Sequence, residues 1–234
     1  MTTLDFGDFD VLTFDCYGTL IDWEAGLLAA LRPPLAAHGV EIDDDAALQA
    51  FARHEAEIEG GPYKRYREVL AGVLTAMLGE AGERPSREEV GAFGASVADW
   101  PAFPDSVAAL AKLHERFKLG VITNCDDDLF AASEARLGTA FDWVVTAQQA
   151  KRYKPNPRGF ELMFERVGLP PARILHVAQS LFHDHVTAKR LGLSTVWVDR
   201  RAGREGGGAT PPAEATPNLV VPDMATLAAL VAPE

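Results

Sequence analysis

The chain has 234 residues, with 22 basic and 34 acidic side chains, so its formal net charge is -12 at pH 7. Its 47% hydrophobic and 24% charged residues are typical of a globular protein and exclude a disordered chain, a collagen or a disulfide-rich mini-domain. The acid excess argues against nucleic acid and an anionic membrane surface as partners. A small anionic substrate stays compatible with it, because a pocket can gather a few cations locally.

The sequence favours a cytoplasmic location. Two cysteines argue against a disulfide framework and for a reducing compartment. The first ten residues, MTTLDFGDFD, hold three acids and no apolar run, which is unlike a signal peptide. No stretch of about 18 uncharged apolar residues occurs, so we expect no membrane span.

Short apolar runs alternate with helical patterns through most of the chain. Buried strands are predicted at 11–14, 119–123, 143–146, 174–178 and 195–198. Helices are predicted between the later strands at 105–116, 129–137, 158–167 and 185–191. This alternation predicts an α/β fold with a doubly wound, Rossmann-like parallel sheet. Residues 202–217 read as a flexible loop, followed by an edge strand at 218–221 and a closing helix at 224–231.

A helical block interrupts this pattern after the first strand. Helices are predicted at 23–31, 46–59, 63–78 and 87–98, and the first is expected to end at Pro33 and Pro34. Ser86 and Glu89 form a capping-box pattern, and Asp44 or Asp45 is expected to cap the second helix. We therefore predict a core formed by residues 1–20 and 99–234, with a helical cap inserted at 21–98.

Polar residues follow four of the predicted strands. Asp15 comes after the first, Thr123 and Asn124 after the second, Lys154 after the third and Asp184 after the fourth. The carboxyl ends of parallel strands meet at one edge, where open α/β sheets bind their ligands. Any one of these residues is more simply a helix cap or a surface charge. Their joint occurrence at one edge predicts a nucleophile with its supporting groups.

The segments that hold these residues resemble the four motifs of the haloacid dehalogenase superfamily. They read FDCYGTL at 14–20, ITN at 122–124, YKPNP at 153–157 and AQSLFHD at 178–184. Within that superfamily the chain is most similar to the 2-haloacid dehalogenases, and the helical block has the position of the superfamily's cap.

Two departures from the phosphatases of the superfamily shape the functional expectation. Those enzymes carry an acid two residues after the nucleophile, where this chain has Tyr17, and a halide leaves without a proton whereas an alkoxide benefits from one. They also bind Mg²⁺ through an Asp where this chain has Gln179, and an amide is a weaker Mg²⁺ ligand than a carboxylate. The resemblance therefore implies a metal-independent hydrolase with no cofactor.

The resemblance also implies a role for each motif residue. Asp15 would displace halide from a short 2-haloalkanoic acid and form an ester, which water would hydrolyse to a 2-hydroxy acid. Lys154 would hold Asp15 ionised, and Thr19 and Thr123 would donate hydrogen bonds to it. Asp184 would assist the attacking water or steady Lys154.

A further set of residues is expected to bind the small anionic substrate. They are Tyr17 with the backbone N–H groups of its loop, Asn124, Ser180, Phe182 and Arg53. Arg53 would be the cap cation for the carboxylate and the halide, although it also reads as a surface Arg paired with Glu57. Arg65 and Arg67 are the other candidates for the cap cation.

Several readings stay open at this point. His183 is a second candidate for the base that activates water, while His176 reads as a core histidine and Cys16 and Cys125 as packing residues. A phosphatase or other small-molecule hydrolase on the same scaffold and a non-catalytic anion-binding protein are the alternative functions. Relatives of this type are often dimers, so a homodimer is a further expectation.

Overall fold

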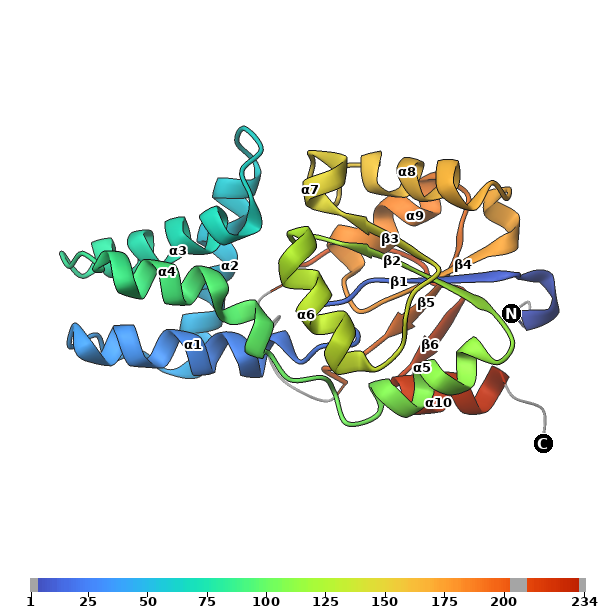
Figure 1. Cartoon of the computed structure of the whole chain (residues 1–234), viewed down its shortest axis with the longest axis horizontal. Helices are drawn as coiled ribbons and strands as arrows, with labels where there is room; N and C mark the ends of the chain where they lie inside the picture. The colour runs from blue at the N-terminus through green and yellow to red at the C-terminus, as the bar shows by residue number, and fades with distance from the viewer. Residues whose placement is uncertain (1–3, 203–209, 232–234) are drawn as a thin grey trace.

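The computed structural model describes residues 4–202 and 210–231, and its centre is a six-stranded parallel sheet (Figure 1). The strands are β1 (Val11–Phe14), β2 (Lys118–Thr123), β3 (Trp143–Thr146), β4 (Ile174–Ala178), β5 (Ser194–Val198) and β6 (Leu219–Val221). Their order across the sheet is β3-β2-β1-β4-β5-β6. The predicted α/β class and all six predicted strands are confirmed, with shifts of one residue at three strand starts.

The strand order reverses beside β1, and this reversal fixes where a ligand site forms. β1 pairs with β2 on one side and with β4 on the other, so that Phe14 aligns with Val121 and with Val177. All four β1 residues are buried, as expected for a strand covered on both faces. Asp15 therefore follows the central strand at the switch point of the sheet.

Helices cover both faces of this sheet. They are α5 (Ser106–His114), α6 (Asp127–Leu137), α7 (Ala147–Ala150), α8 (Arg158–Val167), α9 (Val186–Arg190) and α10 (Met224–Val231). Figure 1 shows α7, α8 and α9 on one face and α5 and α10 on the other. The helix predicted at 185–191 is α9, preceded by a π-helical turn at Leu181–His185. Of the predicted loop at 202–217, residues 203–209 lie outside the described part of the chain.

Four helices lie between β1 and β2 and beyond one end of the sheet (Figure 1). They are α1 (Trp23–Ala37), α2 (Asp44–Glu59), α3 (Tyr66–Glu80) and α4 (Arg87–Ala95), and we call them the α1–α4 insert. The Ser86–Glu89 capping box at the start of α4 is confirmed. The predicted cap of α2 is wrong by one residue, because the Asp43 carboxylate accepts from the backbone N–H of Ala46 at 2.8 Å.

The predicted end of the first helix at Pro33 and Pro34 is also wrong, because α1 runs through both prolines to Ala37. A proline inside a helix removes one backbone hydrogen bond but keeps a φ compatible with helix. Here Leu31, Pro34 and Leu35 are all buried. Their burial offsets the lost bonds, which the local sequence pattern cannot show.

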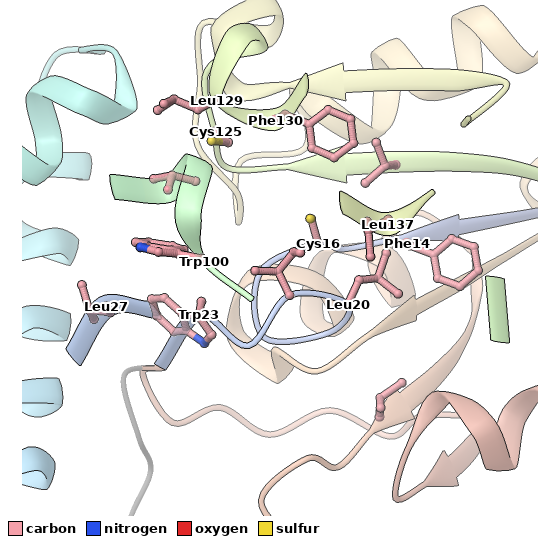
Figure 2. Packing of buried hydrophobic residues seen from close by; sticks show 14 of the residues in the cluster. Phe14, Cys16, Leu20, Trp23, Leu27, Trp100, Cys125, Leu129, Phe130 and Leu137 are labelled. Atoms are coloured by element: carbon pink, nitrogen blue, oxygen red, sulfur yellow. The ribbon is translucent and has the colours of Figure 1, made fainter. Parts of the chain in front are cut away.

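A single apolar cluster joins the sheet to the insert. Figure 2 shows part of this cluster, from Leu27 of α1 to Phe14 of β1, with the Trp100 ring near α1. The ring packs so closely on Gly26 that a Cβ there would lie 2.4 Å from it. The insert is therefore packed against the core around Trp100.

Candidate active site

A small cavity lies at the carboxyl ends of the strands, where the insert meets the sheet. Its volume is about 40 Å³, which is room for one or two water molecules. The described residues that line it are Asp15, Tyr17, Trp23, Glu55, Glu59, Tyr66, Asn124, Lys154, Gln179, Ser180, His183, Asp184 and Thr210. Six of the ten predicted site residues thus line it: Asp15, Tyr17, Asn124, Lys154, Ser180 and Asp184.

Lys154 joins two buried carboxylates at the base of the cavity. Its ammonium donates to Asp15 Oδ1 at 2.8 Å and to Asp184 Oδ1 at 2.8 Å. Its third hydrogen bond goes to the backbone carbonyl of Ile122 at 2.9 Å. Side-chain exposure is 4% for Lys154, 8% for Asp15 and 0% for Asp184, so the three groups form a desolvated ion network.

The ionisation of this network follows from burial and charge. Burial raises the pKa of Asp15 above its usual value, although the charge of Lys154 opposes the shift. Burial acts against the charge of Lys154, but Asp15 and Asp184 outweigh it and raise the pKa of the lysine. Burial also acts against the charge of Asp184, yet Lys154 and the His176 hydrogen bond hold the pKa of this carboxyl below its usual range.

Backbone and hydroxyl contacts fix the positions of Asp15 and Lys154. Thr19 Oγ1 donates to Asp15 Oδ2 at 2.7 Å and accepts from the backbone N–H of Gln179 at 2.9 Å. The Asn124 side chain accepts from the Lys154 backbone N–H at 2.7 Å and donates to the Lys154 carbonyl at 3.1 Å. Thr19 therefore positions the carboxylate as predicted, and Asn124 positions the lysine backbone.

His176 has a larger part in the site than a core histidine. Its Nε2 lies 3.0 Å from Asp184 Oδ1, and its Nδ1 lies 2.9 Å from the hydroxyl of Thr13. The ring also packs edge-on against Phe160, with centroids 5.0 Å apart. His176 thus helps to fix the position of Asp184 through Oδ1. The other oxygen, Asp184 Oδ2, is buried and has no hydrogen-bond partner among the described residues.

Tyr17, Ser180 and His183 are three of the polar residues in the wall of the cavity beside this network. The Tyr17 hydroxyl lies 3.0 Å from Ser133 Oγ. Ser180 Oγ lies 3.0 Å from His183 Nδ1, and burial lowers the pKa of His183 to about 4. At neutral pH His183 is therefore an uncharged imidazole beside the site.

The cation expected from the insert is not at the cavity, and this prediction is wrong. The Arg53 side chain is 57% exposed and donates to Glu80 at 2.7 Å. Its ion-pair partner is therefore Glu80 and not Glu57, which the sequence suggested. Arg65 and Arg67 also point elsewhere: Arg65 donates to Gln148, and Arg67 pairs with Asp126 and Asp128. Among the described residues, Lys154 is the only Lys or Arg that lines the cavity.

Two further predictions need correction. The hydrogen bond expected from Thr123 to Asp15 is absent, because Thr123 Oγ1 is buried without a partner in the described part of the chain. Phe182 does not line the cavity; its ring packs edge-on against His183, with centroids 5.0 Å apart. It belongs to the π-helical turn that precedes α9, whose geometry the sequence did not reveal.

Sequence reasoning missed Thr210 and three wall residues that come from the insert. The three from the insert are Glu55 and Glu59 of α2 and Tyr66 of α3. The Tyr66 hydroxyl donates to Glu55 Oε1 at 2.8 Å. A signal existed, since Glu55 and Glu59 continue at helical spacing the buried stripe that begins with Leu48 and Phe51.

The residues at the cavity are a poor match to a divalent-metal site. Asp184 Oδ1 is already shared by Lys154 and His176, and Gln179 stands where the superfamily's phosphatases have a carboxylate. No group of three or more His, Cys, Asp or Glu residues that could hold a metal ion occurs in residues 4–202 and 210–231.

The two cysteines are also poorly suited to chemistry at this site. Both are fully buried in the apolar cluster (Figure 2). Burial raises the pKa of Cys125 to about 12 and also raises the pKa of Cys16. Their thiols stay protonated at neutral pH, in agreement with the packing role predicted for them.

Comparison with known proteins places this geometry in context. A family model described as haloacid dehalogenase-like hydrolase matches residues 9–192. The (S)-2-haloacid dehalogenase of Xanthobacter autotrophicus is 26% identical over 81% of this chain and 74% of that protein. The validoxylamine A 7'-phosphate phosphatase of Streptomyces hygroscopicus subsp. limoneus is 28% identical over 80% and 84%.

The fold has counterparts among solved structures. The L-2-haloacid dehalogenase structure from Xanthobacter autotrophicus superimposes with a TM-score of 0.79 at 24% identity, covering 95% of this chain and 98% of that one. This likeness concerns the fold.

No helix in the described residues combines the length and the apolar character needed to cross a bilayer.

Proposed function

Because the chain belongs to the haloacid dehalogenase-like hydrolase family, we propose that it removes halide hydrolytically from short 2-haloalkanoic acids through an ester on Asp15. The observation that carries this proposal is the network in which Lys154 and Thr19 hold the two oxygens of Asp15 at the base of a small cavity. A fixed and desolvated carboxylate is a competent nucleophile toward carbon.

The reaction divides into two steps at Asp15. A carboxylate oxygen of Asp15 attacks the carbon that bears the halogen, the carbon–halogen bond breaks, and halide leaves with the electron pair. Water then adds to Cγ of the ester, the bond from Cγ to the original Asp15 oxygen breaks, and the 2-hydroxy acid leaves with that oxygen. One proton and one halide ion are released for each water consumed.

The surrounding groups support these steps. Lys154 offsets the charge of Asp15 and Asp184, and Asp184 Oδ2 is a buried acceptor available to the attacking water. The loop after β1 uses the N–H groups of Gly18, Thr19, Leu20 and Ile21 internally. The amides of Cys16 and Tyr17 have no such partner in the described chain and are available to an anion or oxyanion.

Carbon–halogen cleavage fits this site better than phosphate ester hydrolysis. Tyr17 stands where a phosphatase would carry its acid, and its hydroxyl is engaged by Ser133. Burial raises the pKa of Tyr17 well above its usual value, so it is a poor proton donor to an alkoxide. A halide leaving group needs no such donor.

We also propose that residues 21–98 act as a cap over a core of residues 1–20 and 99–234, and that substrate enters when the cap moves.

The test is a substrate panel with Asp15→Asn as the inactive variant and Asp45→Asn, on an exposed part of α2, as the matched control. Halide release from 2-chloro- and 2-bromocarboxylates in EDTA is expected for the wild type and the control and absent in Asp15→Asn. Mg²⁺-dependent turnover of p-nitrophenyl phosphate without halide release would refute dehalogenation. Because burial raises the pKa of Asp15, the acid limb of the pH–rate profile should lie above the usual range of an aspartate.

A further inference from the structure

The wall of the cavity that comes from the insert is acidic. Glu55 and Glu59 lie one turn apart on α2 and line the same cavity as Asp15 and Asp184. Of the described residues, four carboxylates and a single lysine therefore face this space. Lys154 is already 2.8 Å from both Asp15 and Asp184, so the two glutamates are left without a cation of their own.

The contacts of the two glutamates leave acceptor capacity facing the cavity. Glu55 is 7% exposed and its Oε1 accepts from Tyr66, while its Oε2 has no hydrogen bond or ion pair with the described residues. Glu59 has no hydrogen bond or ion pair with any described residue. Asp184 Oδ2, the acceptor assigned above to the attacking water, is also buried and without a partner among the described residues.

A carboxylate with an unpaired oxygen is costly where it is buried, as Glu55 is, or half-buried, as Glu59 is, and a ligand that supplies donors or positive charge removes that cost. On the basis of the proposed function, which places the reacting carbon at Asp15, we propose that Glu55 and Glu59 select substrates whose group opposite Asp15 is an ammonium or another hydrogen-bond donor. A second anionic group at that position would be rejected by the same wall. The substrate is then a small haloacid with a donor substituent.

The protonation of the wall gives this selectivity a pH dependence. Burial raises the pKa of Glu55 to about 7, and burial together with Glu55 raises the pKa of Glu59. The titratable and charged groups around them on all packed elements are Tyr66, Asp15, Lys154, Tyr153, Cys125, His183 and Asp184. An ammonium favours the ionised glutamates, so its affinity should rise with pH and that of an anion should fall.

The first experiment measures binding without chemistry, by ligand-observed NMR with ethylammonium and acetate as probes. Glu55→Gln and Glu59→Gln are compared with Glu57→Gln, a control at an exposed position of the same helix. We expect ethylammonium affinity to fall by about tenfold or more in each of the two wall variants, which is about 1.4 kcal/mol, and by less than about twofold in the control. In the wild type it should rise by about tenfold from pH 6 to pH 8, since a group with a pKa of about 7 goes from about one tenth to nine tenths ionised.

The second experiment measures halide release from 2-chlorobutyrate, 2-chloro-3-hydroxypropionate and 2-chlorosuccinate. The wild type should prefer the hydroxyl-bearing substrate, and Glu59→Gln should lower that preference and raise kcat/KM for chlorosuccinate. Two results would overturn the inference. One is halide release with the same substrate selectivity in Glu55→Gln and Glu59→Gln as in the wild type, and the other is ethylammonium affinity that these two substitutions do not change. Loss of ethylammonium binding in the variants with no halide from any substrate would support the acidic wall and refute the dehalogenase function instead.

Discussion

Replacing Lys154 by Met tests the ion network at the base of the site. The substitution keeps an unbranched side chain but removes an ammonium that is 4% exposed and donates to Asp15, Asp184 and the carbonyl of Ile122. Two carboxylates with 8% and 0% side-chain exposure then share a desolvated space without a cation. Breaking a buried ion pair from one side costs about 3–5 kcal/mol, a large part of the stability of a typical domain.

The pH dependence of this loss follows from the two carboxyl groups. In the wild type, Lys154 and His176 hold the pKa of Asp184 below its usual range against burial, so this carboxylate stabilises the fold at neutral pH and does so less as pH falls. In Lys154→Met, burial raises the folded-state pKa of both carboxyls. Raised pKa values favour folding at low pH and oppose it as pH rises through them. The stability difference between the proteins should therefore be largest near pH 7 and smaller near pH 4.5.

Urea unfolding of the wild type, Lys154→Met and the control Lys112→Met at both pH values measures these differences. Lys112 lies on an exposed position of α5, so its substitution should change the free energy of unfolding by less than about 0.5 kcal/mol. A loss below about 1 kcal/mol for Lys154→Met at pH 7 would refute the reasoning. A loss of the same size at both pH values would show that packing, and not charge, sets the effect.

Two further changes test the packing of the site and of the insert. Thr19→Val removes the donor to Asp15 and the acceptor of the Gln179 backbone N–H. Urea unfolding should show that the free energy of unfolding falls by about 2 kcal/mol. A change near zero would mean that these hydrogen bonds are dispensable. Gly26→Ala puts a Cβ 2.4 Å from the Trp100 ring, so thermal unfolding should show about 1–3 kcal/mol of destabilisation. Gly79→Ala, whose Cβ would meet nothing within 4 Å, should be neutral or stabilising, and equal effects at both glycines would contradict the packing argument.

The sheet and most of the catalytic network were predictable from the sequence because their determinants are local. Runs such as VLTF at Val11–Phe14 mark buried strands, and parallel strands bring the residues after them to one edge whatever the intervening chain does. Asp15, Lys154 and Asp184 therefore meet although up to 169 positions separate them, with Lys154 Nζ 2.8 Å from each carboxylate.

The residues of the insert were less predictable, because helix rotation and packing decide which side chains reach the cavity. Arg53 lies two positions before Glu55, which is a rotation of about 200° around α2, so the two side chains face in nearly opposite directions. The acids, and not the arginine, consequently line the cavity. The role of His176 was hidden in the same way, because its contact with Asp184 depends on the turn after β4.

A single turnover in oxygen-18-labelled water tests the central claim, that Asp15 is the nucleophile, most directly. Enzyme in excess converts one equivalent of a 2-chlorocarboxylate, and mass spectrometry then follows the label in the product and in the peptide that contains Asp15. Attack by Asp15 followed by hydrolysis at Cγ predicts label on Asp15 and an unlabelled hydroxyl in the product. Label in the product hydroxyl with none on Asp15 would show direct attack by water and contradict the account.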